Sequence, residues 1–529
     1  MNCRMFTGWL SLAVVALSTL NSVAAAIGGN LISWSFVGSR QIVANTNAVT
    51  LGKIAALAES GPMLDRLAEK LAGSIASSVG LPTNVAARIQ ALLVDLFQSP
   101  SAGSWTGASL GTADIGLAVQ LETSRIQSWQ TALQGIIGPA DGKTSETTVQ
   151  GFKGMTWTAP YNRGQVRLIK AGEWFVVTLG GAEAGQEMLV SLKNSGRPVA
   201  MGEAWLQAEI DWPRLAVVDL PLKPAVTAIT VGFKDDHLRT TIKARYPQDL
   251  AWKSAEVRVP TNIVVEPIIS FTAMQNPAAF LAKALDFRAD ELNPTAGPLF
   301  VWAQGHMPFQ TFAAFPVNNS SNRLKSLAQS LPKAWNQTLT NLNQSQLRWD
   351  TNRQNLAWSG LAIIAPYLES ATSPSGDFLV AGLFPPLPSR TPPPMEMLQQ
   401  IREAKNLAYY DWEITQFRLM QWRGLSQLLP WFPLRPKYSD KERLQLIAPI
   451  DSGAASQKWL TAAAPMLGNT VTEVTVPAPN QAVLVRKSHL GLTGVELVAL
   501  AHWLTDPLEP RESPRSGVPA PAVPPPKPK

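Results

Sequence analysis

The chain has 529 residues, of which 46% are hydrophobic and 16% charged, and its formal net charge at pH 7 is +7. This length exceeds the roughly 100–200 residues of a typical domain, which excludes a single small module, and the composition excludes a disordered chain and a mostly membrane-embedded one. The charge is modest for the length, so it favours contact with anionic surfaces without implying nucleic acid.

The first 26 residues have the pattern of an export signal. Arg4 gives a positive start, an apolar stretch spans residues 9–20, and small residues at 22–26 suit signal peptidase. The apolar stretch is too short for a durable anchor, and no later run of ~18 apolar residues exists. Cys3, the only cysteine, lies in the segment that would be removed, so the mature chain would have no disulfide or cysteine nucleophile. We predict an exported protein, periplasmic or extracellular, with no transmembrane segment after cleavage.

A hairpin around residues 234–237 shows strict alternation. One face of its second strand carries Leu238, Thr240, Ile242 and Ala244, and the other carries Arg239, Thr241, Lys243 and Arg245. We predict a core face and a basic face, and other predicted strands add Arg163, Arg167 and Lys170 to the basic side. The basic face could bind an anionic envelope polymer or a lipid headgroup. Alternatively, its charges only keep an open antiparallel sheet soluble.

A pattern of strand, turn, amphipathic helix and further strands recurs along the chain. Four candidate copies begin near Ile115, Gln310, Asp377 and Leu444. A last helix would follow the fourth copy, opening with a capping box from Thr493 to Glu496, in which hydroxyl and carboxylate accept amide protons of the first turn.

These elements predict an α+β fold, in which repeated strand-helix-hairpin units form antiparallel sheets covered by helices, in two or three lobes. We expect a signal peptide at 1–26, an N-terminal lobe at 27–290, a middle lobe at 291–436 and a C-terminal β-α-β-β-α unit at 437–505. Residues 506–529 are proline-rich, so we expect a disordered tail there.

Three apolar-rich segments carry a resemblance to other proteins. They are GDFLVAGLFPP at 376–386, NLAYYDWEIT at 406–415 and KSHLGLTGVELVALAHWL at 487–504. In these segments the chain resembles a family of large exported bacterial proteins to which no activity is assigned. The resemblance implies a bacterial source and a continuous fold, and it transfers no catalytic residue.

Familiar catalytic and cofactor motifs are not supported. The four histidines, His237, His306, His489 and His502, are far apart in sequence and lack metal-binding spacing. The GxSxG match around Ser109 lacks the strand before it and the helix after it. The glycines at 180–185 follow a strand but lack the spacing of a phosphate loop, so we interpret them as a tight turn before a helix. We therefore expect no metal site and no cofactor.

Asp411 and Glu413 form the best carboxylate pair. They would project from the same face of one strand, flanked by Tyr409, Tyr410 and Trp412. Paired acids beside aromatic residues occur in glycoside hydrolases. Acids near a strand end also cap helices or meet basic neighbours, and the helix expected after Thr415 offers such a role.

The sequence thus leaves two hypotheses for function. We favour an exported, non-enzymatic binding or scaffold protein of the bacterial envelope, with an anionic envelope polymer or another envelope protein as its partner. The alternative is an envelope glycan hydrolase that uses Asp411 and Glu413.

Overall fold

The structure is a computed structural model that describes residues 30–505 with gaps. The gaps are 80, 82, 108–113, 138–142, 159–163, 200–202, 216–223, 251, 253–254, 277–296, 306–309, 339–345, 361–363, 388 and 429–452. The predicted signal peptide with Cys3, the serine motif around Ser109, the strand expected from Leu444 and the proline-rich tail all lie outside the described residues.

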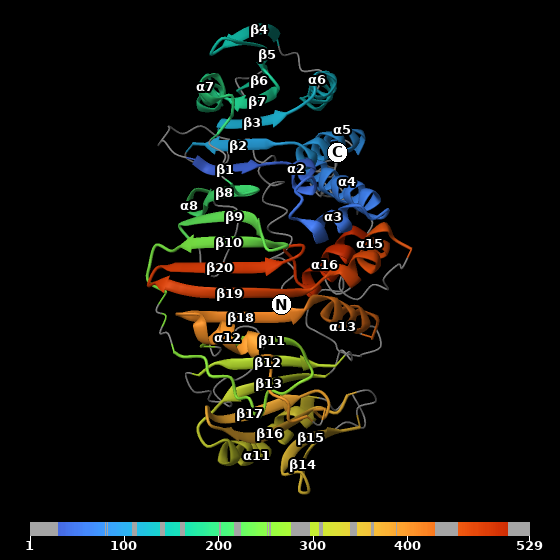
Figure 1. Cartoon of the computed structure of the whole chain (residues 1–529), viewed down its shortest axis with the longest axis vertical. Coiled ribbons are helices and arrows are strands. Elements are labelled where there is room, and N and C mark those ends of the chain that lie inside the picture. Colours follow the sequence, from blue (N-terminus) through green and yellow to red (C-terminus); the bar gives the residue numbers. More distant parts are fainter. Residues whose placement is uncertain are drawn as a thin grey trace, which may run out of the picture.

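All strands of the described residues belong to one antiparallel sheet of twenty, which extends along the long axis of the molecule (Figure 1). The order across the sheet is β4-β5-β6-β7-β3-β2-β1-β8-β9-β10-β20-β19-β18-β11-β12-β13-β17-β16-β15-β14. Strands of all three predicted lobes therefore pair within a single sheet.

The first ten strands form the N-terminal half of the sheet. They are β1 (Asn30–Phe36), β2 (Ser101–Thr106), β3 (Asp114–Gln120), β4 (Lys143–Val149), β5 (Phe152–Thr158), β6 (Gln165–Ala171), β7 (Trp174–Gly180), β8 (Leu206–Asp211), β9 (Val226–Lys234) and β10 (His237–Arg245).

The last ten strands form the C-terminal half. They are β11 (Ile268–Met274), β12 (Leu299–Gln304), β13 (Thr311–Pro316), β14 (Gln346–Asp350), β15 (Asn355–Ser359), β16 (Tyr367–Ser373), β17 (Gly376–Gly382), β18 (Leu407–Ile414), β19 (Asn469–Ala478) and β20 (Gln481–Ser488).

The two halves repeat one strand order. Counted outward from the centre, the N-terminal half reads 10-9-8-1-2-3-7-6-5-4, and the C-terminal half reads the same numbers with ten added. In the described part of the sheet the halves join only through β10 and β20, whose register places Leu238 opposite Ser488 and Arg245 opposite Gln481. We call this pairing the seam.

Helices connect the strands. The N-terminal half carries α2 (Ser39–Val43), α3 (Val49–Ala55), α4 (Ser60–Val79), α5 (Thr83–Gln98), α6 (Thr123–Ile137), α7 (Gln186–Ser195) and α8 (Trp212–Leu215). The C-terminal half carries α11 (Ser320–Thr338), α12 (Met395–Glu403), α13 (Thr415–Leu428), α15 (Ala455–Ala463), the 3-10 turn η4 (Ala464–Met466) and α16 (Gly494–Thr505).

One helical group joins distant parts of the chain. Helices α4, α15, α16 and α13 lie together on one side of the strands, to the right in Figure 1. Their apolar faces share a core that includes Met63, Leu419, Leu460 and Leu497, and the buried Trp459 Nε1 donates to Ser60 Oγ at 3.0 Å. The N-terminal half is thus tied to the C-terminal half by helix packing as well as by the seam.

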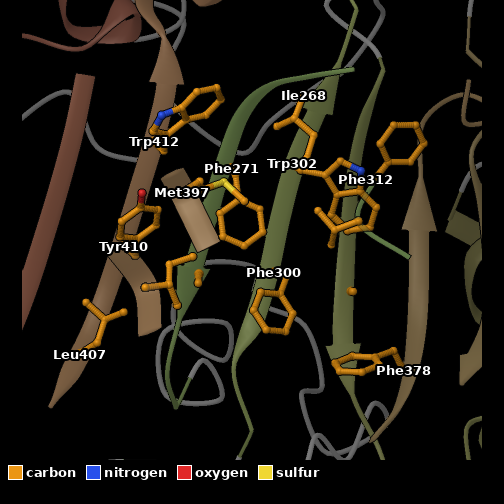
Figure 2. Packing of buried hydrophobic residues seen from close by; sticks show 14 of the residues in the cluster. Ile268, Phe271, Phe300, Trp302, Phe312, Phe378, Met397, Leu407, Tyr410 and Trp412 are labelled. Atoms are coloured by element: carbon orange, nitrogen blue, oxygen red, sulfur yellow. The ribbon is translucent and has the colours of Figure 1, made fainter. Parts of the chain in front are cut away.

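The largest core of the C-terminal half is aromatic. Phe271, Phe300, Trp302 and Phe312 on β11–β13 pack with Tyr410 on β18 (Figure 2). Helix α12 covers this cluster with Met397 and Ile401. Fully burying such a side chain contributes about 1.5–3 kcal/mol, so this cluster fixes the position of β18 firmly.

The α+β class and the antiparallel sheet are confirmed. The predicted capping box is also present, because Glu496 Oε2 accepts the Thr493 amide at 2.8 Å and Thr493 Oγ1 accepts the Glu496 amide at 3.4 Å. None of the described helices is long and apolar enough to cross a membrane.

Candidate functional site

Strand β18 presents its two acids, together with Tyr409, on the face opposite to Tyr410 and Trp412. Tyr410 and Trp412 point into the aromatic core (Figure 2). By the alternation of a strand, Asp411 and Glu413 project from the other face, where β18 leads directly into α13. Thr272 on β11 and Thr472 on β19 flank Asp411 in register.

Asp411 is held by a short hydrogen bond. The Thr272 hydroxyl donates to its Oδ1 at 2.6 Å. Burial raises the pKa of Asp411, while the bond from Thr272 and the positive charges of Arg418 and Arg486 oppose that rise. Asp411 therefore already has a donor and two cationic neighbours within the fold.

Glu413 caps a helix, although not the expected one. Its side chain is buried, and its Oε1 accepts the amide hydrogen of Gly494, the first residue of α16, at 2.6 Å. The side chain of Thr415, the first residue of α13, also hydrogen-bonds to Glu413, so this carboxylate contacts the start of the helix expected from the sequence while it caps an amide of α16. Burial, and then repulsion from Asp411, raise its pKa to about 7.

Two arginines complete a charged group around the acids. Arg418 lies on α13, and burial lowers its pKa while Glu413 and Asp411 counteract this. Arg486 on β20 donates to Glu496 Oε2 at 2.7 Å and to Thr472 Oγ1 at 2.9 Å. We call Asp411, Glu413, Arg418, Arg486 and Glu496 the charge cluster. Within it Arg486 pairs with Glu496, whereas Asp411 accepts from Thr272, Glu413 accepts from the Gly494 amide and Arg418 donates to Gln421.

The predicted basic face is solvent-exposed. Arg239, Lys243 and Arg245 are exposed on β10, and Lys487 on β20 lies opposite Arg239 in register. The other face of β10 is half-buried and not a sealed core. Lys170 is also exposed, and Arg163 lies outside the described residues.

Arg167 does not belong to this basic face, contrary to the prediction. It is buried, and its guanidinium donates to the carbonyl oxygens of Ala182 at 2.8 Å and Gly181 at 3.2 Å. Asp114 Oδ1 accepts the Gly181 amide at 2.7 Å in the same loop. The glycine-rich segment at 180–185 is therefore an internally bonded turn before α7.

The structure brings together two histidines that are far apart in sequence. His237 and His489 stack at the end of the seam, with ring centroids 4.5 Å apart. His489 Nδ1 accepts the Gly468 amide at 3.0 Å, and the neighbouring Asp236 accepts the Thr50 hydroxyl at 2.6 Å. Burial, and then His237, lower the pKa of His489. No local pattern could have predicted this pair, because it depends on which strands meet at the seam.

Within the described ranges, no group of three or more histidine, cysteine or acidic side chains could hold a metal ion. The charge cluster is also an unsuitable cation site, because two arginines share it with the carboxylates.

Comparisons with known proteins add little. No family model matches the chain, and no curated protein matches it. Three solved structures are similar over part of it. "Structure of crystal form III of TP0453" has 12% identity and a TM-score of 0.21, covering 47% of this chain and 83% of the other. "Structure of crystal form IV of TP0453" has 11% identity and a TM-score of 0.20, covering 44% and 79%. Such low scores carry no argument about fold or function.

Proposed function

We propose that this protein is an exported, non-enzymatic binding or scaffold protein of the bacterial envelope. The proposal of export comes from the sequence pattern at 1–26. The observation that carries the non-enzymatic part is the bond from the Gly494 amide to the buried Glu413 carboxylate. A catalytic acid must reach substrate, whereas Glu413 is 4% exposed and its Oε1 is occupied by a helix end.

The basic face of β10 is the binding surface that we propose. Arg239, Lys243 and Arg245 share one face of β10 with Thr241, and all three cations are exposed. Such a row suits an extended anionic polymer, because Lys243 and Arg245 lie about 7 Å apart along the strand and Arg239 lies about 13 Å before Lys243. Another envelope protein with an acidic surface would fit the same charges.

The binding proposal can be tested with soluble polyphosphate as the probe. We expect the full chain to bind it with an affinity that falls as salt is raised, since exposed charges are screened. The variant Arg239→Glu/Lys243→Glu/Arg245→Glu should bind at least roughly tenfold more weakly, as expected when a charged surface is reversed. A matched control, Lys153→Glu/Lys193→Glu/Arg402→Glu, changes as many exposed charges elsewhere. Equal loss in both variants would reject the basic face as the binding surface.

Glycan hydrolysis remains the second candidate because of one observation. Burial and Asp411 raise the pKa of Glu413 to about 7, the range that suits a general acid. A screen of envelope glycans at pH 6 with the unmodified protein and Glu413→Gln tests this. Turnover by the first protein that is lost in the second would establish hydrolysis.

We also propose that the chain arose by duplication of a ten-strand unit. The shared strand order of the two halves supports a twofold repeat of ten strands. It does not support the four shorter repeats expected from the sequence. Of those four, the copies beginning at β3 and β13 take equivalent places, whereas the copy beginning at β17 corresponds to β7, which was not taken as the start of a copy. The lobe boundaries near 290 and 436 remain predictions.

A further inference from the structure

The two ends of the seam carry different side chains. At one end Arg245 lies opposite Gln481. At the other end the same register, continued by one position, places His237 opposite His489, and the two rings stack with their centroids 4.5 Å apart and an interplanar angle of 20°. Pairing of β10 with β20 therefore does not by itself call for two imidazoles, and the histidine pair needs a separate explanation.

Backbone groups fix the tautomer of each ring. His489 Nδ1 accepts the Gly468 amide at 3.0 Å, so the lone pair is on Nδ1 and the ring hydrogen is on Nε2. His237 Nδ1 lies 2.6 Å from the carbonyl oxygen of Asp235. A carbonyl oxygen can only accept, so here the hydrogen is on Nδ1 and Nε2 carries the lone pair. Burial lowers the pKa of His489, which favours this neutral form.

The outer nitrogens of both rings are unpaired within the part of the chain that the structure describes. Neither His237 Nε2 nor His489 Nε2 has a hydrogen-bond partner there. Both side chains are half-buried. The pair thus presents one N–H donor, on His489, and one lone pair, on His237. A ligand that satisfies both nitrogens must accept one hydrogen bond and donate another.

Cations flank the histidine pair on the same face of the sheet. Lys234 lies directly opposite His237, and Lys487 is two positions before His489. Arg239 is two positions after His237 and lies opposite Lys487. Residues that oppose one another across antiparallel strands, or lie two apart along one strand, project from the same face. The histidine pair is therefore one end of the basic face.

Two acids lie in the turn between β9 and β10. Asp236 is close enough for its charge to interact with His237 and His489. Its two oxygens accept the Thr50 amide at 3.0 Å and the Thr50 hydroxyl at 2.6 Å, so they do not compete for the two Nε2 atoms. Asp235 is exposed, and solvent screens its charge. Two negative charges thus stand against the three cations, which leaves this end of the face positive.

We propose that the histidine pair is a subsite for a terminal phosphate group, at which a phosphate polymer begins its path along the basic face. A terminal phosphate has a second pKa of about 6, so near neutral pH it exchanges a proton readily. One of its oxygens accepts from His489 Nε2, and a single proton joins another oxygen to His237 Nε2. A phosphate inside the polymer has no such hydroxyl. The proposal rests on the binding function proposed above and names the end of that surface.

Histidine-specific NMR of the full chain tests the subsite, because the chain has only four histidines. With isotope-labelled imidazole Cε1 atoms, tripolyphosphate should shift the signals of His237 and His489 in a saturable way. The signal of His502, buried on α16, should stay in place. Trimetaphosphate, a ring without end groups, should bind at least roughly tenfold more weakly, the change expected when charge-assisted hydrogen bonds are lost.

A double variant isolates the two outer nitrogens. His237→Asn/His489→Asn removes both Nε2 atoms, while the shorter amide side chains can still donate to the Asp235 carbonyl and accept from the Gly468 amide. Tripolyphosphate should bind this variant roughly tenfold more weakly, no better than trimetaphosphate. The control Gln481→Asn changes a polar side chain at the opposite end of the seam and should leave the affinity unchanged.

The possible outcomes separate the subsite from the rest of the basic face. Histidine signals that do not move, an unchanged affinity in the double variant, or equal binding of the linear and cyclic phosphates would each overturn the subsite. Polyphosphate binding that survives the double variant but is lost when the basic face is reversed would reject the subsite alone. Histidine signals that shift, together with binding that is insensitive to that reversal, would keep the subsite and reject the basic face as the path of the polymer.

Discussion

The N-terminal half fills the space beside the end of β8 with Ile210 and Leu215, while the C-terminal half fills the same space beside β18 with Glu413 and Arg418. Both halves nevertheless build the same order of ten antiparallel strands. The same strand order is therefore compatible with either apolar or charged side chains packed beside this strand end. The charged filling also supplies the acceptor for the first amide of α16, Glu413 Oε1, which an apolar side chain could not do.

Removing the positive charge of Arg418 should have the largest effect on the free energy of unfolding. Arg418→Met leaves Asp411 and Glu413 with less positive charge inside the protein, and we expect the free energy of unfolding at pH 8 to fall by about 3 kcal/mol. The matched change in the N-terminal half, Leu215→Met, conserves volume and should cost less than about 1.5 kcal/mol. Chemical denaturation of both variants measures the difference, and equal losses would contradict a special role for the charge.

Removal of the helix cap should cost less. Glu413→Ala leaves the Gly494 amide without its acceptor, so we expect a loss of about 1–2 kcal/mol at pH 6. Asp411→Ala removes the acceptor of the Thr272 hydroxyl and should cost about 1 kcal/mol. Denaturation at pH 6 checks both values. Stabilisation by both substitutions, together with loss of a glycan-cleaving activity, would instead favour the hydrolase.

The seam should lose a small amount of stability on acidification. Burial and His237 keep the pKa of His489 below its ordinary value, so the unfolded chain takes up a proton first as the pH falls. Stability should therefore drop by about 0.5–1 kcal/mol between pH 7.5 and 5.5, and His489→Gln should reduce this drop. Thermal melts over this range measure it. A drop that is unchanged in the variant would place the acid sensitivity elsewhere.

The basic face should contribute least to stability. Arg239, Lys243 and Arg245 are exposed, so reversing their charges should leave the melting temperature unchanged within error while polyphosphate binding weakens. A melting temperature lowered by several degrees would show that these residues support the sheet.

Local patterns predicted much of the fold. The capping box at Thr493 and the alternation on β10 were predictable because each depends on residues within a few positions of one another along the chain. The structure contains both. The β4–β5 hairpin was missed, because its polar run KTSETTV has no apolar alternation. Strand order across the sheet was not predictable either, since the seam joins residues 238–245 to residues 481–488 and no local pattern records such pairing.

The candidate site was predicted in part. The spacing of Asp411 and Glu413 on one strand identified them as the candidate pair. It left open whether their role is structural or catalytic. It could not identify Arg418 and Arg486 as their neighbours, because these residues lie on α13 and β20 and only the folded structure places them near the acids. The bond to Gly494 spans more than eighty residues of sequence, and only the packing of α16 brings it about.

The most direct test of the account is the unfolding free energy of the triple variant Asp411→Asn/Glu413→Gln/Arg418→Met. It neutralises three members of the charge cluster with side chains of similar size, retains oxygen acceptors for Thr272 and Gly494, and leaves the Arg486–Glu496 pair intact. If the charges are an addition to a fold that does not need them, the triple variant should recover most of the stability lost in Arg418→Met at pH 8. A triple variant less stable than Arg418→Met alone would contradict the account.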